Sequence, residues 1–129
     1  MKTNQARPEI PSIQKEIGTK DIEVFQNDIL RPIIKQLHAL LLAHFSNLLL
    51  KKKGQYFKTA EDQKANYIHS IFQKELQYKA ELKGIIIGNF TEKEFEHYSM
   101  ISSQIDKRIY SIVEERILTN QQELQDLSK

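Results

Sequence analysis

The most apolar part of the chain runs from residue 29 to residue 50, and its apolar positions repeat with the period of an α-helix. At about 100° per residue, one broad stripe collects Leu30, Ile33, Ile34, Leu37, Leu40, Leu41, Phe45 and Leu48. Leu42 and Leu49 widen this stripe, whereas Ala39, Ala43 and Leu50 lie on another side. A helix that is apolar over most of its circumference needs cover from more than one direction. We therefore expect it at the centre of a bundle or against a second chain.

A membrane span is the competing interpretation of this stretch. The densest run, residues 37–50, has 14 residues and includes His38, His44, Ser46 and Asn47. Crossing a bilayer takes about 20 predominantly apolar residues. We therefore predict no membrane span.

The ends of this first helix carry recognisable signals. Asp21 can cap its start, and Pro32 either kinks a continuous helix or lies in the first turn of a new one. Lysines 51–53 followed by Gly54 predict its end, because lysines complement the helix dipole and glycine accepts a left-handed cap.

A second helix is expected to begin at Thr59. Its apolar stripe contains Tyr67, Ile68, Ile71, Phe72, Tyr78, Leu82, Ile85 and Ile86. Glu75 interrupts this stripe with a charge. Gly84 and Gly88 allow either a close helix crossing or an extended link near the end of the helix.

Thr91 and Glu94 form a capping box for a third helix. Its stripe contains Phe95, Tyr98, Ile101, Ile105, Ile109, Ile112 and Val113. Arg116 follows where an apolar residue was due, and the sequence becomes polar after Leu118. We predict an all-α, up-down-up antiparallel bundle of three long helices at residues 21–119. Residues 1–20 are expected to form a mobile arm and residues 120–129 a polar tail.

Composition narrows the class of protein. The chain has 129 residues, of which 40% are hydrophobic and 28% charged, as in a soluble single domain. Zero cysteines exclude disulfides, thiolate metal sites and a cysteine nucleophile. The N-terminus lacks a signal-peptide core, so we expect the cytoplasm. A formal net charge of +2 is too small to indicate a nucleic-acid partner.

Glu75 is the first candidate for chemistry. A carboxylate on an apolar stripe can serve as an acid, a base or a metal ligand. The alternative is a structural ion pair, because a buried charge without a partner is costly. Folding the three helices back on each other places Glu75 level with His38 on one side and Arg108 on the other. We favour the structural pair.

The histidines give weaker signals. Glu94 and His97 have the Glu-x-x-His spacing of di-iron bundles, but no second copy occurs, and Glu94 is already part of the capping box. His44 lies near the centre of the first stripe. No His-x-x-x-His pair brings two ligands onto one helix face, so packing roles are favoured over metal binding.

The sequence contains two further groups of residues that are candidates for ligand binding. A cleft lined by Tyr78, Tyr98 and Glu75 is one option for a ligand. The second group is a basic patch near two aromatic residues, which could contact phosphates or an anionic membrane surface. It consists of Lys51, Lys52, Lys53 and Lys58, close to Tyr56 and Phe57.

Three segments, ILRPIIKQLHALLLAHFSNLLLKKKGQYFK, LKGIIIGNFTEKEFEHY and KRIYSIVEERI, carry a resemblance over residues 22–118. They resemble a family of short, uncharacterised, all-helical bacterial proteins that automatic labels sometimes call glyoxalase. Metal-dependent glyoxalases resemble paired βαβββ modules with ligands on strands, whereas every candidate here falls on a helical pattern. The resemblance therefore supplies no catalytic residue.

Surplus apolar helix surface without a chemical motif predicts a homodimer that acts by protein contact, as an interaction or scaffold module. The alternative is a bundle that binds a metal or small molecule, with or without catalysis, through Glu75, His38 or His44, and Glu94 with His97. No cofactor is predicted, and an enzyme is the less favoured class.

Overall fold

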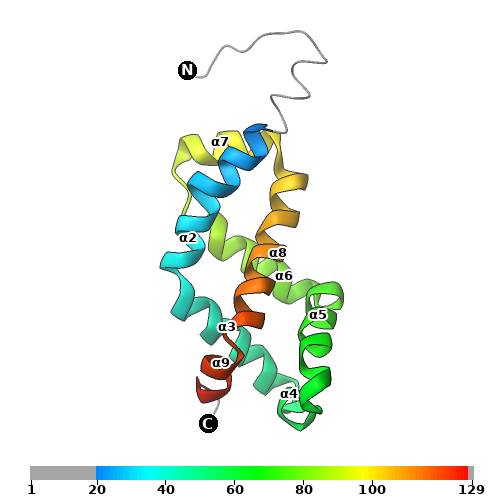
Figure 1. The fold of residues 1–129 in the computed structure, drawn as a ribbon. Helices are drawn as coiled ribbons and strands as arrows, with labels where there is room; N and C mark the ends of the chain where they lie inside the picture. The colour runs from blue at the N-terminus through cyan, green and yellow to red at the C-terminus, as the bar shows by residue number, and fades with distance from the viewer. Residues whose placement is uncertain (1–19, 128–129) are drawn as a thin grey trace.

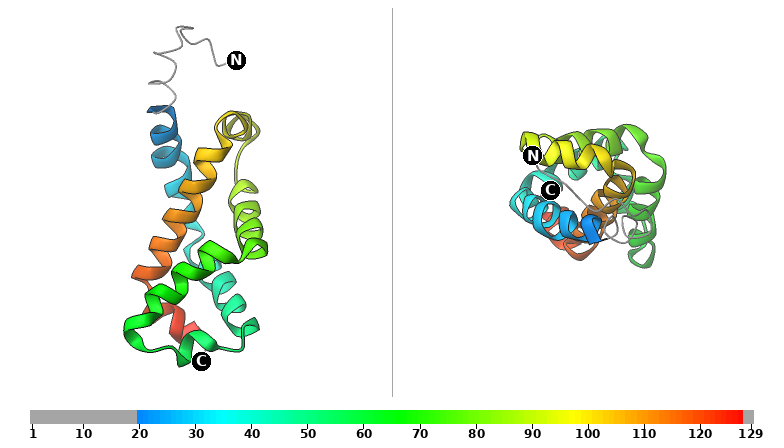
Figure 2. Two further views of the ribbon diagram at one scale, coloured as in Figure 1. Left: turned by 90° about the vertical axis from the view of Figure 1, so that its right-hand side faces the viewer. Right: turned by 90° about the horizontal axis from the view of Figure 1, so that it is seen from above.

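The computed structural model describes residues 20–127. Within that range the chain is all-α, as predicted, with 88% helix, eight α-helices and no strand. Figures 1 and 2 show α8 running through the middle of the molecule, with α7 at one end and α4 and α9 at the other. Residues 1–19 of the expected N-terminal arm lie outside the described residues.

The molecule is not the simple bundle of three long helices that we expected, because each of those helices is divided. The first expected helix becomes Lys20–Gln36 and α3 (His38–Lys51), with the short α4 (Gln55–Lys58) after it. The second becomes α5 (Lys64–Lys74) and α6 (Leu76–Ile87). The third becomes α7 (Glu92–Met100), α8 (Ser102–Thr119) and α9 (Gln121–Leu127).

Pro32 lies in the first turn of α2 (Arg31–Gln36), directly after the π-helical segment η1 (Gln26–Leu30). Proline has no N–H and its ring collides with the carbonyl four residues earlier. The wider turn, in which the Arg31 N–H donates to the Gln26 carbonyl, gives that ring room. Pro32 therefore produces a π-helical turn and does not break the helix.

Of the two alternatives for Pro32, the structure thus has the first turn of a helix and not a kink, and the sharp bend lies five residues later, at Leu37. The helices on either side meet at 68°. Backbone hydrogen bonds continue across the bend, from the Leu37 N–H to Ile33 and from the Leu41 N–H to Leu37. No single helix of the described residues is long and apolar enough to span a membrane, although this bent pair passes the same test of length and composition.

α3 ends at the predicted lysine and glycine signal, but the left-handed conformation begins at a lysine, Lys53, and continues at Gly54. Lys53 has φ of 64° and Gly54 has φ of 66°. The Gly54 N–H donates to the Leu49 carbonyl and the Lys53 N–H to the Leu50 carbonyl, which is the Schellman pattern. The helix end is thus closed by backbone bonds.

Thr59 does not cap the second helix, contrary to our expectation. Its hydroxyl donates to the Gln55 carbonyl and closes the end of α4. A 3₁₀ turn, Glu61–Gln63, then leads into α5. α4 exists because Tyr56 is fully buried and ties this turn to the core.

The division between α5 and α6 falls on Glu75, the charge that interrupted the second stripe. A continuous helix would carry this carboxylate into the core, where it would need a partner. The backbone instead leaves the helical region, with φ −87° and ψ 85°, and Glu75 reaches Lys52. Gly84 lies inside α6 with open space where a Cβ would be, so it serves neither a close crossing nor an extended link.

The third segment begins with the predicted capping box, in which Thr91 and Glu94 bond each other reciprocally. Phe95 from the predicted stripe is 48% exposed, whereas Tyr98 and the isoleucines of α8 are buried. The expected polar tail contains α9, whose Leu124 is fully buried. Leu124 and the contacts of Gln121 with Tyr56 and of Glu123 with His38 connect that helix to the rest of the molecule.

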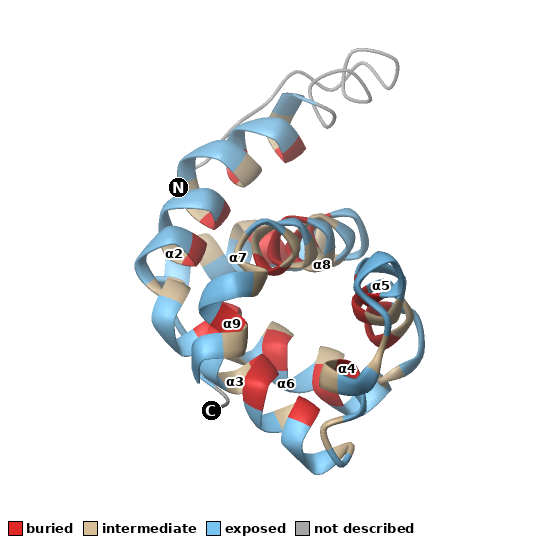
Figure 3. Cartoon of the chain, turned by 60° about the horizontal axis from the view of Figure 1, so that its bottom comes forward, coloured by how far each residue is buried: buried red, intermediate tan, exposed pale blue. Residues whose placement is uncertain are grey.

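A single cluster of buried side chains connects the helices. Its fully buried members come from every part of the described chain (Figure 3) and include Phe25, Leu30, Ile34, Leu42, Phe45, Leu49, Tyr56, Ile68, Leu82, Ile86, Ile105, Ile109, Val113, Ile117 and Leu124. The core therefore contains most of each apolar stripe, although the helices that bear them are broken. Leu40 of the first stripe and Phe95 of the third were expected in the core but are 50% and 48% exposed.

We expect Leu41→Ala to lower the free energy of unfolding by about 2–5 kcal/mol, because it opens a cavity at a buried site. Leu41 is 1% exposed, whereas its neighbour Leu40 is 50% exposed. Leu40→Ala is the matched control and should change stability far less. Urea unfolding followed by circular dichroism measures both, and equal losses would contradict this placement of the core face of α3.

Candidate functional site

The break at Glu75 brings the end of α3 against the start of α6 and leaves a small pocket between them. Its volume is about 160 Å³. The pocket is lined by His44, Asn47, Leu48 and Lys51 from α3 and by Glu75, Gln77, Tyr78 and Glu81 from the break and α6. Most of these side chains are polar, so the pocket is wet and charged.

One wall of the pocket consists of two stacked rings. The centroids of His44 and Tyr78 are 5.0 Å apart, and the ring planes differ by 23°. The His44 Nδ1 and the Tyr78 hydroxyl are both buried and have no hydrogen-bond partner among the described residues. Each unpaired buried group costs about 1–3 kcal/mol. Burial also raises the pKa of Tyr78 far above its ordinary value, so the hydroxyl stays protonated.

Glu81 holds His44 in place. The imidazole Nε2 is 2.9 Å from one carboxylate oxygen of Glu81, and the Gln77 amide donates to the other oxygen at 3.3 Å. These two bonds, together with the charges of His44 and Lys51, lower the pKa of Glu81. With the proton on Nε2, the lone pair of His44 lies on the buried Nδ1.

Glu75 pairs with Lys52 and not with the partners we expected, Arg108 or His38. The Lys52 ammonium is 2.6 Å from the Glu75 carboxylate, and the two side chains are equally exposed, at 33%. The hydrogen bond that the Lys52 ammonium donates to Glu75 raises the pKa of Lys52. Arg108 donates instead to the Gln26 amide oxygen. Glu75 thus lies in an ion pair at the rim of the pocket, with a partner other than the two that we expected.

The two buried groups of the stacked rings are poorly placed to exchange a proton with a molecule in the pocket. The free nitrogen of His44 is buried, so it cannot take a proton from a molecule in the pocket without a movement of the ring. Tyr78 keeps its proton. The accessible polar groups are those of Glu75, Glu81, Lys51, Asn47 and Gln77.

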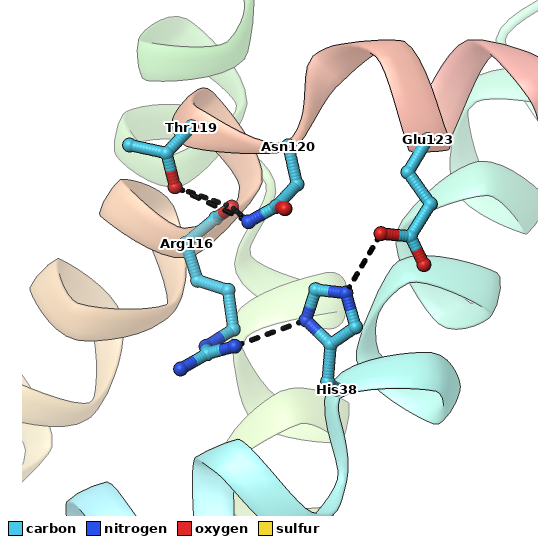
Figure 4. Close-up of polar contacts among 5 residues, drawn as sticks. All are labelled: His38, Arg116, Thr119, Asn120 and Glu123. Carbon is cyan, nitrogen blue, oxygen red and sulfur yellow. Dashed lines mark hydrogen bonds and ion pairs between the residues drawn. The ribbon is translucent and has the colours of Figure 1, made fainter.

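His38 lies in a separate network (Figure 4). Its Nδ1 accepts from the Arg116 guanidinium at 3.1 Å, and its Nε2 is 3.0 Å from Glu123. Both ring nitrogens are therefore engaged, and the network joins α3, α8 and α9. This contact explains why Arg116 appears where the third stripe called for an apolar residue.

All four histidines of the chain pair with a carboxylate from another element. His97 pairs with Asp21 and His69 with Glu114. Glu94 is occupied by the capping box. Among residues 20–127, no group of three or more His, Asp or Glu side chains is placed to hold a metal ion. The five candidate ligands thus serve five separate structural contacts.

The basic patch is also divided by the fold. Lys52 is paired with Glu75, and Lys51 lines the pocket. Tyr56 is fully buried, where its hydroxyl donates to Gln121 at 2.6 Å. The Tyr56 ring therefore cannot stack on a nucleic-acid base, whereas the second aromatic residue of the patch, Phe57, is half-buried.

Of the three residues in the expected cleft, Glu75 and Tyr78 line the pocket and Tyr98 does not. The Tyr98 hydroxyl donates to Asp106 at 2.6 Å, on the other side of α6. Glu81 and Lys51 were not recognised as members of a pocket. The sequence signal for Glu81 was indirect: His44 lies on an apolar face and needs a polar partner. Helical spacing alone does not identify which carboxylate is that partner.

Comparison of the chain with protein-family models, curated proteins and solved structures finds no match. The resemblance described above therefore stays a prediction. What the site can do has to be argued from its own residues.

Tyr78→Phe should leave the free energy of unfolding unchanged or raise it by about 1 kcal/mol, because it removes a buried hydroxyl without a partner. Tyr98→Phe is the matched control and should lower the free energy of unfolding by about 1.5–3 kcal/mol, since the Tyr98 hydroxyl that it removes bonds a charged group. Chemical denaturation of both variants measures the difference. Equal losses would mean that the Tyr78 hydroxyl has a partner in solution.

Glu81→Gln should reduce stability at neutral pH and make little difference in acid. The pKa of Glu81 is lowered from 4.5 in the folded protein, so its contribution is present above pH 4.5 and is lost as pH falls through the folded pKa. Urea unfolding of wild type and variant across this range gives the difference curve. Glu115→Gln, at an exposed position of α8, should give a flat curve.

Proposed function

We propose that the protein acts by protein contact, as an oligomerising interaction module, and that a second copy of the chain covers the outer face of α3. That face carries the observation on which the proposal rests. Leu40 is 50% exposed and Leu50 is 55% exposed, and Ala39 and Ala43 are exposed on the same helix. Unpartnered apolar surface of this kind marks interaction sites.

The charge pattern favours a second copy as the occupant. Between residues 36 and 50 the sequence has no Asp, Glu, Lys or Arg. Two such faces therefore meet without like-charge repulsion, and the alanines let the helices approach closely. In an antiparallel pairing, Lys53 after the end of one α3 lies near Glu123, which sits beside His38 at the start of the other. The opposite charges at the two ends of the paired α3 helices thus attract each other.

The area required also bears on the interface. α3 has 14 residues and is about 21 Å long, whereas a stable dimer buries about 800 Å² on each partner. One helix face is small for this purpose. α9 packs against α3 and exposes Leu127 at 51%, so it supplies further apolar surface at the same end of the molecule.

We expect Leu40→Glu to convert a wild-type dimer into a monomer, because a two-fold contact would bury two new carboxylates without partners. Light scattering coupled to size-exclusion chromatography measures the mass. Met100→Glu is the control: Met100 is 77% exposed on α7, away from this face, and its variant should remain a dimer.

Circular dichroism should show the same helix content and similar melting for both variants, since both positions are exposed. A wild-type protein that is monomeric at high concentration would refute the proposal. So would a Leu40→Glu variant that keeps the dimer mass, because the interface would then lie elsewhere.

A further inference from the structure

Two opposite charges line the pocket between α3 and α6 without touching each other. Glu81 and Lys51 both line it, and Lys51 acts on Glu81 through its charge. Among the described residues Lys51 makes no ion pair. We infer that this pocket binds a small zwitterion, a free α-amino acid, whose carboxylate meets Lys51 and whose ammonium meets Glu81.

The carboxylate end of the ligand has two sources of attraction. Lys51 supplies an exposed ammonium with three N–H donors. Gln77 and Tyr78 belong to the first turn of α6, and Glu75 at its N-cap makes no side-chain cap bond. The positive end of the helix dipole and its unbonded amides therefore favour a negative group at that end of the pocket.

Glu81 binds the ammonium end of the ligand. Each oxygen of its carboxylate already accepts one bond, from His44 and from Gln77. A carboxylate has about four acceptor sites, so there is capacity for an ammonium as well. The lowered pKa of Glu81 keeps it negative at neutral pH.

The remaining charges of the rim cancel, which favours a zwitterion over a simple ion. The Glu75 carboxylate is paired with Lys52 at 2.6 Å, so this pair adds no net charge. An anion alone would meet Glu81, and a cation alone would meet Lys51. A ligand with both charges satisfies the two ends at once.

Size limits the ligand to a short side chain. A volume of about 160 Å³ is close to that of a cavity that holds benzene, so about six to eight non-hydrogen atoms fit. Leu48 and the Tyr78 ring provide an apolar wall for a methyl or hydroxymethyl group. L-Alanine and L-serine are within this range.

The test is an NMR titration of the full-length, ¹⁵N-labelled protein with L-alanine, propionate and ethylamine. L-Alanine should shift the amides of Asn47, Gln77 and Glu81 in a saturable way, with a Kd on the order of 1 mM. Propionate and ethylamine each carry one of the two charges and should bind at least about tenfold more weakly. Absence of saturable shifts with L-alanine, or equal binding of all three compounds, would overturn the inference.

Two variants locate the binding groups. Lys51→Gln and Glu81→Gln should each weaken the binding of L-alanine at least about tenfold. Lys53→Gln is the control, because Lys53 follows Lys51 by two residues and does not line the pocket, and this variant should bind L-alanine as wild type does. If Glu81→Gln disturbs folding, Lys51→Gln decides, because Lys51 is exposed. Unchanged binding in Lys51→Gln would overturn the assignment. Leu40→Glu should retain binding, so this result is independent of the dimer.

Discussion

A charged or basic side chain on an apolar helix face of this protein has to find a partner, because an unpaired charge in the core is costly. Glu75 finds Lys52, His44 finds Glu81, and Arg116 finds His38. In each case the partner belongs to a different helix. These contacts therefore fix how the helices lie against each other, while the apolar cluster provides most of the driving force for folding.

The same constraint explains why the helices are short. At Glu75 the backbone leaves the helical region, and α6 starts in a new direction with Tyr78, Leu82 and Ile86 buried in the core. Leu37 and Ile101 mark comparable breaks in the other segments. Neither break involves glycine or proline, so both reflect packing and not local backbone preference.

Two surfaces with different chemistry result from this arrangement. The outer face of α3 is uncharged and apolar, whereas the flank of the same helix that faces α6 carries His44, Asn47 and Lys51. A 14-residue helix can thus present one side to a second copy and another side to a small ligand. The two surfaces adjoin, because Asn47 lines the pocket and also lies four residues after Ala43 and seven after Leu40 on the exposed side of α3.

The pattern of apolar residues by itself determined the all-α class, the three core stripes, the end of α3 and the capping box at Thr91, because these follow from helical periodicity and from contacts within four residues. It also identified Glu75 and Arg116 as anomalies. Only the tertiary structure decided where the helices break and which partner each anomaly takes, since Glu75 lies 23 residues from Lys52 and His38 lies 78 residues from Arg116. Those pairings depend on how whole helices pack, and a local pattern of residues does not encode that geometry.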